Sequence, residues 1–230
     1  MTVLYEDNHI IAVNKAPGEI VQGDKTGDIP LSETVKAYIK EKYDKPGEVF
    51  LGVPHRLDRP TSGVVLFART SKALSRLSEM FKEKSLDSTQ SSIKKTYWAI
   101  VQGAPKQSEG HLEHWLVRNE AQNKSYVANS SGAKLAILNY RTLAQGEHYT
   151  LLEIELLTGR HHQIRCQLAA IGCPVKGDLK YGAKRSNPDG SISLHAREIT
   201  LVHPVRKETL TITAPVPQGS LFEQLLADNK

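Results

Sequence analysis

The chain of 230 residues contains only two cysteines, Cys166 and Cys173. Two cysteines cannot build a disulfide framework, and their spacing is not that of a zinc site. No apolar run approaches the roughly 18 residues of a membrane-spanning helix. Residues 1–8 carry acids where a signal peptide would carry lysines. We therefore predict a cytoplasmic protein with reduced cysteines and no membrane partner.

Glycine-rich dinucleotide motifs, Walker loops and clusters of metal ligands are also missing from the sequence. Their absence disfavours the enzyme classes that depend on them, so we expect neither a cofactor nor a metal. Charge is nearly balanced, with 30 Lys and Arg against 25 Asp and Glu and a net charge of +5. This excess suits a polyanionic partner, although a mildly basic protein without one would have the same composition.

Hydrophobic periodicity predicts strands and helices in one large domain, or in two small ones that share a sheet. The predicted strands cover residues 9–13, 64–68, 94–103, 112–117, 125–128, 134–143, 148–157 and 210–213. The predicted helices cover residues 31–43, a segment from Ser71, a segment after Gly159, and residues 221–227, with Ser32 and Ser220 as N-caps. Most connections favour antiparallel pairing, with helices over the packed face of the sheet. The polar residues 85–92 predict an exposed, mobile loop.

One acid lies among three arginines in the stretch from His55 to Arg69. Pro60 and Gly63 indicate a turn, and the apolar run that follows indicates a buried strand, so Asp58 is expected on a loop that leads into that strand. Taken alone, an Asp beside an Arg usually makes only a local ion pair. The sequence around Asp58, rather than the acid alone, makes it a candidate functional residue.

A second basic cluster, at residues 160–165, follows the strand that ends near Leu157. Arg160, His161, His162 and Arg165 at the start of a helix would form a plausible cradle for phosphate, because the backbone amides there already favour anions. The two adjacent histidines could instead suggest a metal. Adjacent helical residues point in different directions, however, and no carboxylate or cysteine has ligand spacing.

Three segments together resemble the RluA family of pseudouridine synthases. The sequence H-R-L-D-R-P-T-S-G at residues 55–63 is similar to the family signature H-R-L-D-x-x-T-S-G. Residues 94–103 are similar to K-x-Y-x-A-x-V-x-G, and residues 158–165 to T-G-R-x-H-Q-I-R. Residues 14–18, N-K-A-P-G, differ from the family's N-K-P-x-G by the place of the proline, so no functional residue is carried over from them. Segments near Gly172 and His195 also match, and we interpret them as mainly structural.

The resemblance implies an α+β fold: a long, mostly antiparallel mixed sheet flanked by helices, with a central RNA-binding cleft. It implies one catalytic domain over residues 1–230, made of two halves that share the sheet, without the small N-terminal RNA-binding domain of many relatives. The implied reaction breaks the bond from ribose to a uracil nitrogen, rotates the base and rejoins it through carbon, without redox change or cofactor. The implied partner is a structured RNA, either tRNA or large-subunit rRNA. We expect a monomer, because no apolar interface stripe is visible.

The resemblance also assigns roles to individual residues. Asp58 would be the catalytic nucleophile or base, paired with Arg165, while Tyr97 would pack against the target uracil. Arg56 would enter the stack that the flipped base leaves. His55, Thr61, Arg160 and His162 are the further expected substrate contacts.

Two other classes of function fit parts of the pattern. A non-catalytic RNA-binding module could share the fold, since fold alone does not confer activity. A glycoside hydrolase would normally place two cooperating carboxylates at the scissile bond, and only one acid lies in a strong motif here.

Overall fold

The computed structural model describes residues 1–24, 26–82 and 92–229. Most of the predicted loop at 85–92 therefore lies outside the described residues. The strands are β1 (Thr2–Glu6), β2 (Ile10–Lys15), β3 (Ser62–Ala68), β4 (Ile93–Gln102), β5 (Glu109–Asn119), β6 (Lys124–Val127), β7 (Lys134–Gln145), β8 (Tyr149–Leu156), β9 (Leu194–Val202) and β10 (Thr209–Thr213). The helices are α1 (Leu31–Lys42), α2 (Ser71–Lys82), α3 (Gln163–Ala170) and α4 (Leu221–Asp228), with a 3-10 turn at Leu179–Tyr181.

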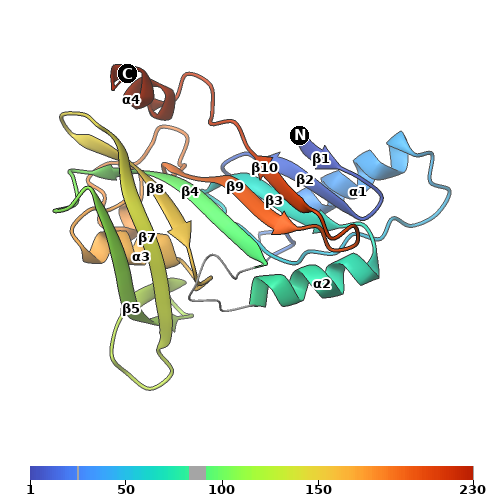
Figure 1. Ribbon diagram of the computed structural model, residues 1–230, viewed down its shortest axis with the longest axis horizontal. Helices are drawn as coiled ribbons and strands as arrows, with labels where there is room; N and C mark the ends of the chain where they lie inside the picture. Colours follow the sequence, from blue (N-terminus) through green and yellow to red (C-terminus); the bar gives the residue numbers. More distant parts are fainter. Residues whose placement is uncertain (25, 83–91, 230) are drawn as a thin grey trace.

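The ten described strands form one continuous sheet (Figure 1). Their order is β1-β2-β3-β9-β4-β8-β7-β5-β6, and β10 pairs with β9. Every pairing between these described strands is antiparallel except that of β3 with β9, which is parallel and confined to Ser62–His195 and Gly63–Ala196. The short β3–β9 contact joins the part of the sheet built from β1–β3 to the part built from β4–β8. The prediction of a long, mostly antiparallel mixed sheet is confirmed.

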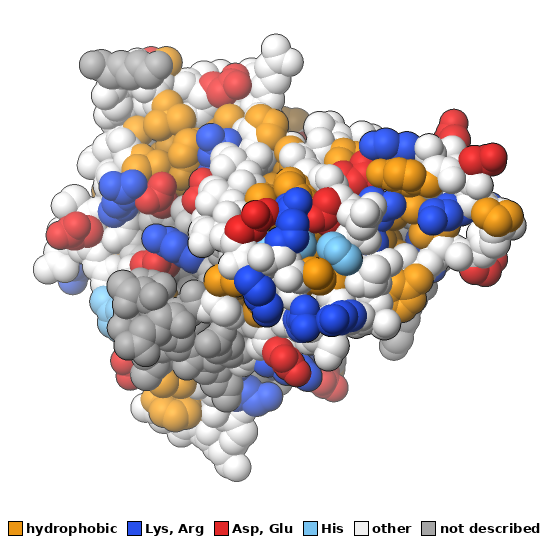
Figure 2. Space-filling view, turned by 45° about the vertical axis from the view of Figure 1, so that its right-hand side comes forward, with side chains coloured by type: hydrophobic (Ala, Val, Ile, Leu, Met, Phe, Trp, Pro, Cys, Tyr) orange, Lys and Arg blue, Asp and Glu red, His pale blue; other side chains and the backbone are white. Residues whose placement is uncertain are grey.

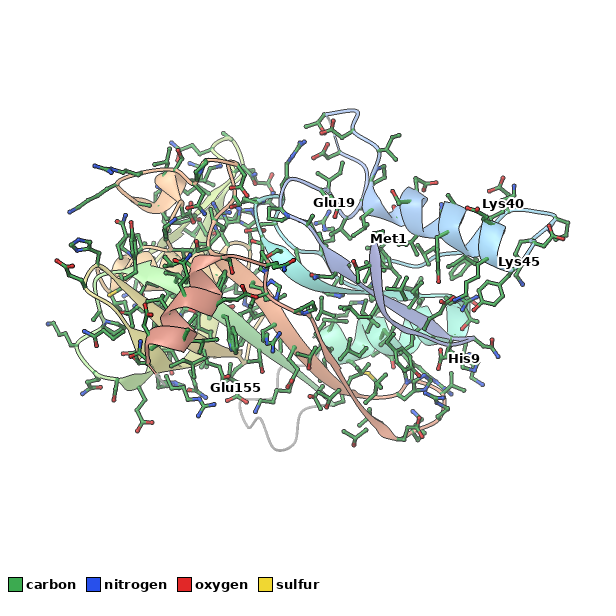
Figure 3. The ribbon with its side chains drawn as sticks, turned by 90° about the horizontal axis from the view of Figure 1, so that it is seen from above. Met1, His9, Glu19, Lys40, Lys45 and Glu155 are labelled. Carbon is green, nitrogen blue, oxygen red and sulfur yellow. The ribbon has the colours of Figure 1, made fainter. Side chains whose placement is uncertain are left out.

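Helices cover both faces of the sheet. At one end, α1 packs on the face of Ile11 and Val65, while α2 packs on the face of Ile10 and Leu66. Because both of their faces are buried, β2 and β3 read as unbroken apolar runs rather than as alternating ones. The view from above shows α1, which carries Lys40, at the end of the molecule away from α4 (Figure 3).

The other end of the sheet is also packed on two sides. Helix α3 covers the face that carries Ala99 and Leu152, and α4 covers Ile100 and Leu151 on the opposite face. The prediction that a helix covers the packed face of residues 152–156 is thus confirmed. No helix within the described ranges combines the length and apolar character needed to cross a lipid bilayer.

The structure differs from the prediction at both of the serine N-caps. Helix α1 begins at Leu31 after Pro30, so the prediction of a Ser32 cap is wrong. The amides of Leu31 and Ser32 donate to the carbonyls of Ile20 and Val21, which leaves no need for a side-chain cap there. Ser220 does occupy the N-cap of α4, but its hydroxyl makes no capping hydrogen bond.

Gly63 allows the close parallel approach of β3 and β9. Its φ is +114°, and a Cβ built on it would lie 2.2 Å from the Ala196 carbonyl oxygen and 2.6 Å from the Ala196 nitrogen. Both groups belong to backbone and cannot rotate away. Gly63, the final residue of the H-R-L-D-R-P-T-S-G segment, is therefore required sterically, because no larger residue fits beside Ala196.

Replacement Gly63→Ala should separate β3 from β9 and strain the backbone at a positive φ. We expect a loss of about 3 kcal/mol or more in the free energy of unfolding, measured by urea denaturation. Gly47→Ala is the matched control, because a Cβ placed on Gly47 would meet no atom within 4 Å. Equal, small losses in the two variants would contradict this account of Gly63.

Candidate active site

Asp58 lies on the loop between the β-bridge residue Gly52 and β3, and a buried lysine holds that loop in place. Lys15, at the end of β2, is fully buried. Its Nζ donates to the carbonyls of Ala16 at 3.0 Å, Arg59 at 3.0 Å and Thr61 at 2.6 Å. Burial lowers the pKa of Lys15 to about 8. Sequence reasoning missed this residue, although a lysine that ends an apolar strand is a visible signal.

The side chain of Asp58 meets Arg165, which arrives from α3. Arg165 Nη1 donates to Asp58 Oδ2 at 2.9 Å. The same guanidinium binds Asp178 through two parallel hydrogen bonds, from Nε at 2.6 Å and Nη2 at 2.9 Å. This bidentate pairing fixes the plane of the guanidinium and aims its remaining nitrogen at Asp58. Asp178 lies in a segment that the sequence suggested to be mainly structural, so its contact with Arg165 was not predicted.

His162 approaches the same carboxylate oxygen, with its Nε2 at 3.5 Å from Asp58 Oδ2. The Tyr181 hydroxyl accepts a hydrogen bond from the Ser125 amide at 2.8 Å and lies 3.0 Å from His162 Nδ1. Because the carboxylate that faces Nε2 is an acceptor, the Tyr181 hydroxyl donates to Nδ1. Nδ1 is then an acceptor and Nε2 carries the ring proton, which faces Asp58. Burial lowers the pKa of His162 to about 3, which keeps the ring neutral.

The two oxygens of Asp58 consequently differ. Arg165 and His162 both face Oδ2, whereas Oδ1 has no hydrogen-bond partner among the described residues. The Asp58 side chain is 30% exposed, against 6% for Arg165 and 1% for Asp178. One carboxylate oxygen is therefore held by the protein, and the other makes no hydrogen bond within the described ranges.

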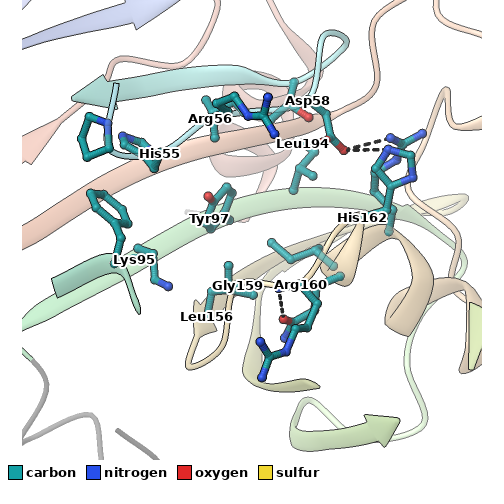
Figure 4. Close-up of a pocket in the computed structure, with 17 residues that line it drawn as sticks. His55, Arg56, Asp58, Lys95, Tyr97, Leu156, Gly159, Arg160, His162 and Leu194 are labelled. Atoms are coloured by element: carbon teal, nitrogen blue, oxygen red, sulfur yellow. Dashed lines mark hydrogen bonds and ion pairs between the residues drawn. The ribbon is translucent and has the colours of Figure 1, made fainter. Parts of the chain in front are cut away.

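A pocket of ≈ 300 Å³ adjoins this carboxylate. It is lined by all eight side chains that the sequence suggested as site residues, which are His55, Arg56, Asp58, Thr61, Tyr97, Arg160, His162 and Arg165. Figure 4 shows Tyr97 in the middle, with Asp58 and His162 at one end and His55 and Lys95 at the other. Leu156, Ile164 and Leu194 supply apolar walls. A small pocket with both apolar and polar walls suits a flat, partly polar ligand.

Tyr97 remains a neutral phenol in this setting. Burial, and then the nearby Asp58 carboxylate, raise the pKa of Tyr97 well above its usual range. No described residue makes a hydrogen bond to its hydroxyl. Thr61 Oγ1 is likewise buried without a partner in the described part of the chain. Arg56 is exposed at the rim of the pocket.

His55 has a structural partner as well as a place in the pocket wall. Its Nε2 accepts the Leu66 amide at 2.9 Å, and its ring stacks on Phe81 with the centroids 4.3 Å apart. Burial lowers the pKa of His55 to about 3, so this ring too is neutral. The hydrogen bond to Leu66 ties the start of the Asp58 loop to β3.

The four basic side chains of the predicted phosphate cradle lie around one hollow, so the cradle stays a prediction. Arg165 and His162 also face Asp58, and His161 binds Ser125 and Asn123. The expectation that the two histidines point apart was wrong, because their rings stack with centroids 3.8 Å apart. The reason is that His162 has a left-handed backbone (φ 51°) and precedes the helix rather than lying in it.

A second hollow, of ≈ 700 Å³, opens beside the pocket and shares several of its walls. Its cationic lining residues are Arg56, Arg59, Arg118, Arg160, Arg165 and Lys180. The acids in its lining are Asp24 and Asp58. This hollow is distinctly basic, whereas Lys, Arg, acidic and apolar side chains are interspersed on the face shown in Figure 2.

Comparison with known proteins decides the family. Residues 9–170 match the family model described as RNA pseudouridylate synthase. The chain belongs to the RNA pseudouridine synthase family.

Curated relatives extend the match over nearly the whole chain. An uncharacterized RNA pseudouridine synthase of Synechocystis sp. is 33% identical over 98% of this chain and 68% of its own length. The ribosomal large subunit pseudouridine synthase C of Vibrio parahaemolyticus is 32% identical over 93% of this chain and 65% of the relative. The tRNA pseudouridine synthase C of Pectobacterium carotovorum is 32% identical over 93% of this chain and 58% of the relative. These relatives confirm the resemblance to the RluA family.

A solved structure supports the fold. The human RNA pseudouridylate synthase domain containing 4 aligns with a TM-score of 0.77 and 24% identity, covering 94% of this chain and 89% of that one. The predicted pseudouridine synthase fold is thus confirmed. As a member of this family the protein is an isomerase, which converts uridine in RNA to pseudouridine.

Neutral, buried histidines should make this pseudouridine synthase sensitive to acid. Burial lowers the pKa of His195 to about 4 and those of His55 and His162 to about 3, from an ordinary value of 6.5. Between these values the unfolded chain binds protons that the folded protein does not, so stability falls as pH is lowered. We expect the melting temperature to decrease from pH 7 to pH 5. His55→Gln, which keeps an acceptor for the Leu66 amide, should decrease less steeply, and an identical slope would contradict this assignment.

Replacement Asp178→Asn should loosen Arg165 without touching the pocket. The amide offers one acceptor where the carboxylate offered two charged ones, so we expect a loss of about 2–3 kcal/mol in unfolding free energy. We also expect a turnover that falls more than RNA affinity. Asp189→Asn is the control, because Asp189 lies exposed nearby and binds only within its own turn among the described residues. Turnover equal to that of the unmodified protein would show that Arg165 holds its position without Asp178.

Proposed function

We propose that this pseudouridine synthase isomerises a specific uridine of tRNA or large-subunit rRNA, with Asp58 as the catalytic carboxylate. The observation that supports this role is the asymmetry of the Asp58 carboxylate. Oδ2 is held by Arg165, Oδ1 has no hydrogen-bond partner among the described residues, and Asp58 lines a pocket together with Tyr97 and apolar side chains. Among the described residues only one acid lines that pocket, as expected for an isomerase that needs a single carboxylate rather than a pair.

The chemistry that Asp58 would perform begins at the sugar of the target uridine. Oδ1 either forms a bond to C1′ as N1 of uracil leaves, or removes a proton from the sugar as the same bond breaks. The uracil then rotates and C5 bonds to C1′, either as the Oδ1–C1′ bond breaks or as Asp58 returns the abstracted proton to the sugar. The proton on C5 is lost, and N1, which carries no proton in uridine, gains one. No electrons are gained or lost overall. Both routes need a carboxylate that is ionised, and the Arg165 guanidinium stabilises that negative charge.

Tyr97 and Arg56 would handle the base and the gap it leaves. A neutral aromatic ring in the middle of the pocket offers a face on which the extruded uracil can stack. Arg56, exposed at the pocket rim, can place its planar guanidinium in the vacated stack. Extrusion of a base costs a few kcal/mol, so such replacement contacts offset part of that cost.

The basic hollow beside the pocket would hold the RNA around the target. Its six cationic side chains lie on both sides of Asp58 in the sequence, from Arg56 to Lys180. The two candidate substrates, tRNA and large-subunit rRNA, are taken from the relatives, because the name of one relative specifies large-subunit rRNA and the name of another specifies tRNA. Mapping pseudouridines in total RNA from a strain that lacks the gene identifies the uridine.

Replacement Asp58→Asn tests the catalytic role. We expect the variant to bind RNA normally but to release tritium from RNA labelled at uracil C5 at least about 10³-fold more slowly. Asp44→Asn is the control, since Asp44 is an exposed acid just after α1. Tritium release by Asp58→Asn at the rate of the unmodified protein would reject Asp58 as catalyst.

The same assay separates the rival functions. A binding module would release no tritium at all, and a hydrolase would liberate free uracil. Either result with the unmodified protein would reject the proposed function.

A further inference from the structure

Lys95 lies at the end of the pocket opposite Asp58. It belongs to β4 and lines the pocket together with Tyr97, two residues further along the strand. Figure 4 shows Tyr97 between Lys95 and Asp58. A Cβ built on Gly159 would lie 3.8 Å from Lys95 Nζ, and Gly159 also lines the pocket. The ammonium group itself, and not only the aliphatic stem, is therefore at the pocket wall.

This ammonium has no polar partner within the part of the chain that the structure describes. Across residues 1–24, 26–82 and 92–229, no carboxylate, carbonyl or hydroxyl makes a hydrogen bond or ion pair with Lys95 Nζ. Its neighbour Lys94 does not line the pocket and pairs with Glu155 at 3.2 Å. A half-buried cation without a counter-charge is costly to the protein, and such groups are usually paired. The pocket therefore favours a ligand that brings an acceptor to Lys95.

Lys95 offers only donors and a positive charge. Burial, and then the charge of Arg160, lower the pKa of Lys95 to about 8, so the group keeps its proton at pH 7. Arg160 lines the same pocket, and its Nε donates to the Leu135 carbonyl at 2.8 Å. An ammonium has three N–H donors and no lone pair. The ligand atom that meets Lys95 must accordingly be an acceptor, and it binds best when it carries negative charge.

The covalent structure of uridine determines which atom of the nucleotide reaches that end of the pocket. The ribose is attached to N1, and C4 lies directly across the ring from N1, so O4 is the atom of the base farthest from the sugar. In pseudouridine the ribose is attached to C5, and C2, which carries O2, lies across the ring. With the sugar at Asp58 and the ring against Tyr97, a carbonyl oxygen points away from Asp58 both before and after the base rotates.

We propose that Lys95 donates a hydrogen bond to this carbonyl oxygen and stabilises the negative charge that the uracil gains as the glycosidic bond breaks. The inference rests on the proposed function, in which Asp58 acts on the sugar. It assigns Lys95 to the opposite side of the same bond cleavage, as the group that stabilises the leaving base.

The electron balance of the cleavage supports a cation at this position. When the C1′–N1 bond breaks, its electron pair stays on N1 and the uracil becomes an anion. Conjugation through C6, C5 and C4 spreads that charge onto O4, and conjugation through C2 spreads it onto O2. No proton leaves Lys95, and nothing is oxidised or reduced. A cation at the carbonyl oxygen binds the departing anion more strongly than the neutral base, so it lowers the barrier.

The same contact would distinguish uridine from cytidine. Cytosine carries an amino group on C4 where uracil carries O4. At the far end of the pocket that amino group would direct its N–H bonds at the Lys95 ammonium, so two donors would face each other. A site that offers only donors at this point rejects the base that lacks the acceptor.

The test measures tritium release in a single turnover. The substrate is total RNA from a strain that lacks the gene, labelled with tritium at uracil C5, and the enzyme is in excess. Lys95→Met should lower the maximal rate at least about 10²-fold, as removal of a donor to a developing anion does. Lys95→Arg keeps a positive charge and N–H donors, so it should stay within about tenfold of the unmodified protein. The control is Lys94→Met, which removes the same charge outside the pocket and should leave the rate unchanged.

The enzyme concentration that gives half of the maximal rate separates a transition-state role from a binding role. Because the charge on the oxygen develops only during cleavage, this concentration should change by less than about threefold in Lys95→Met. An increase as large as the loss of rate would make Lys95 a ground-state contact and overturn the proposal. An unchanged maximal rate would show that Lys95 does not act on the leaving base.

Thermal melting separates a structural role. Removal of a cation that lacks a partner should leave the melting temperature of Lys95→Met equal to or higher than that of the unmodified protein. Lower melting temperatures together with slow release in both Lys95→Met and Lys95→Arg would mean that the lysine supports the fold, which would overturn the proposal.

Failure of the proposed function has a different signature. Absence of tritium release by the unmodified protein would reject that function, and the role of Lys95 with it. Release by the unmodified protein that is lost in Asp58→Asn but kept in Lys95→Met would reject the role of Lys95 alone.

Discussion

The ion pair between Asp58 and Arg165 joins two segments that lie 107 residues apart in the chain. Asp58 belongs to the part of the sheet built around β2 and β3, while Arg165 belongs to the part covered by α3. Those parts touch through the brief parallel pairing of β3 with β9, whose closeness requires Gly63. The position of the ion pair therefore depends on a backbone contact only two residue pairs long. Within the first part, Lys15 holds the Asp58 loop against β2 by binding the carbonyls on either side of Pro60.

Burial of the charged groups around Asp58 is tolerated because they have specific partners. Arg165 is 6% exposed, yet it faces two carboxylates and makes three hydrogen bonds to them. The group formed by one guanidinium and two carboxylates has a net negative charge. Asp178 is fully enclosed with both oxygens occupied, so the available charge and the available lone pair are both at Asp58. The neutral His162 stabilises that anion as a donor without cancelling its charge.

Much of the architecture was predictable from local pattern, and the failures have identifiable causes. Alternation or apolar runs indicated β2 to β8 and β10, among which β2 and β3 are buried on both faces and β5 is largely exposed. Strands β1 and β9 were missed, although β9 pairs with β3, β4 and β10. Its sequence, from Leu194 to Val202, carries His195, Arg197 and Glu198, and these polar side chains are accommodated by specific contacts that no periodicity reports. His195, for example, is fully buried against the Ser62 hydroxyl at 2.8 Å.

The site residues also divide into those that the sequence predicted and those that it missed. The motif residues were expected together, and the structure does place them around one pocket. Asp178 and Lys15 were missed because their roles exist only in three dimensions: one orients a guanidinium, and the other satisfies carbonyls of a distant loop. The histidine pair was misjudged because a single left-handed residue, His162, reverses the direction that a helix would have given to the ring.

Charge is distributed unevenly along the pocket. At one end lies the carboxylate of Asp58, which in the proposed mechanism would face the sugar carbon where positive charge develops as the glycosidic bond breaks. In the middle, Tyr97, Ile164 and Leu194 are uncharged, as the uracil ring is. At the other end Lys95 and Arg160 are positive and have no acid paired to them within the described residues. The carboxylate end suits a carbon that becomes electron-poor and the uncharged middle suits a neutral ring, so electrostatics would help to orient the nucleotide before any base-specific hydrogen bond is made.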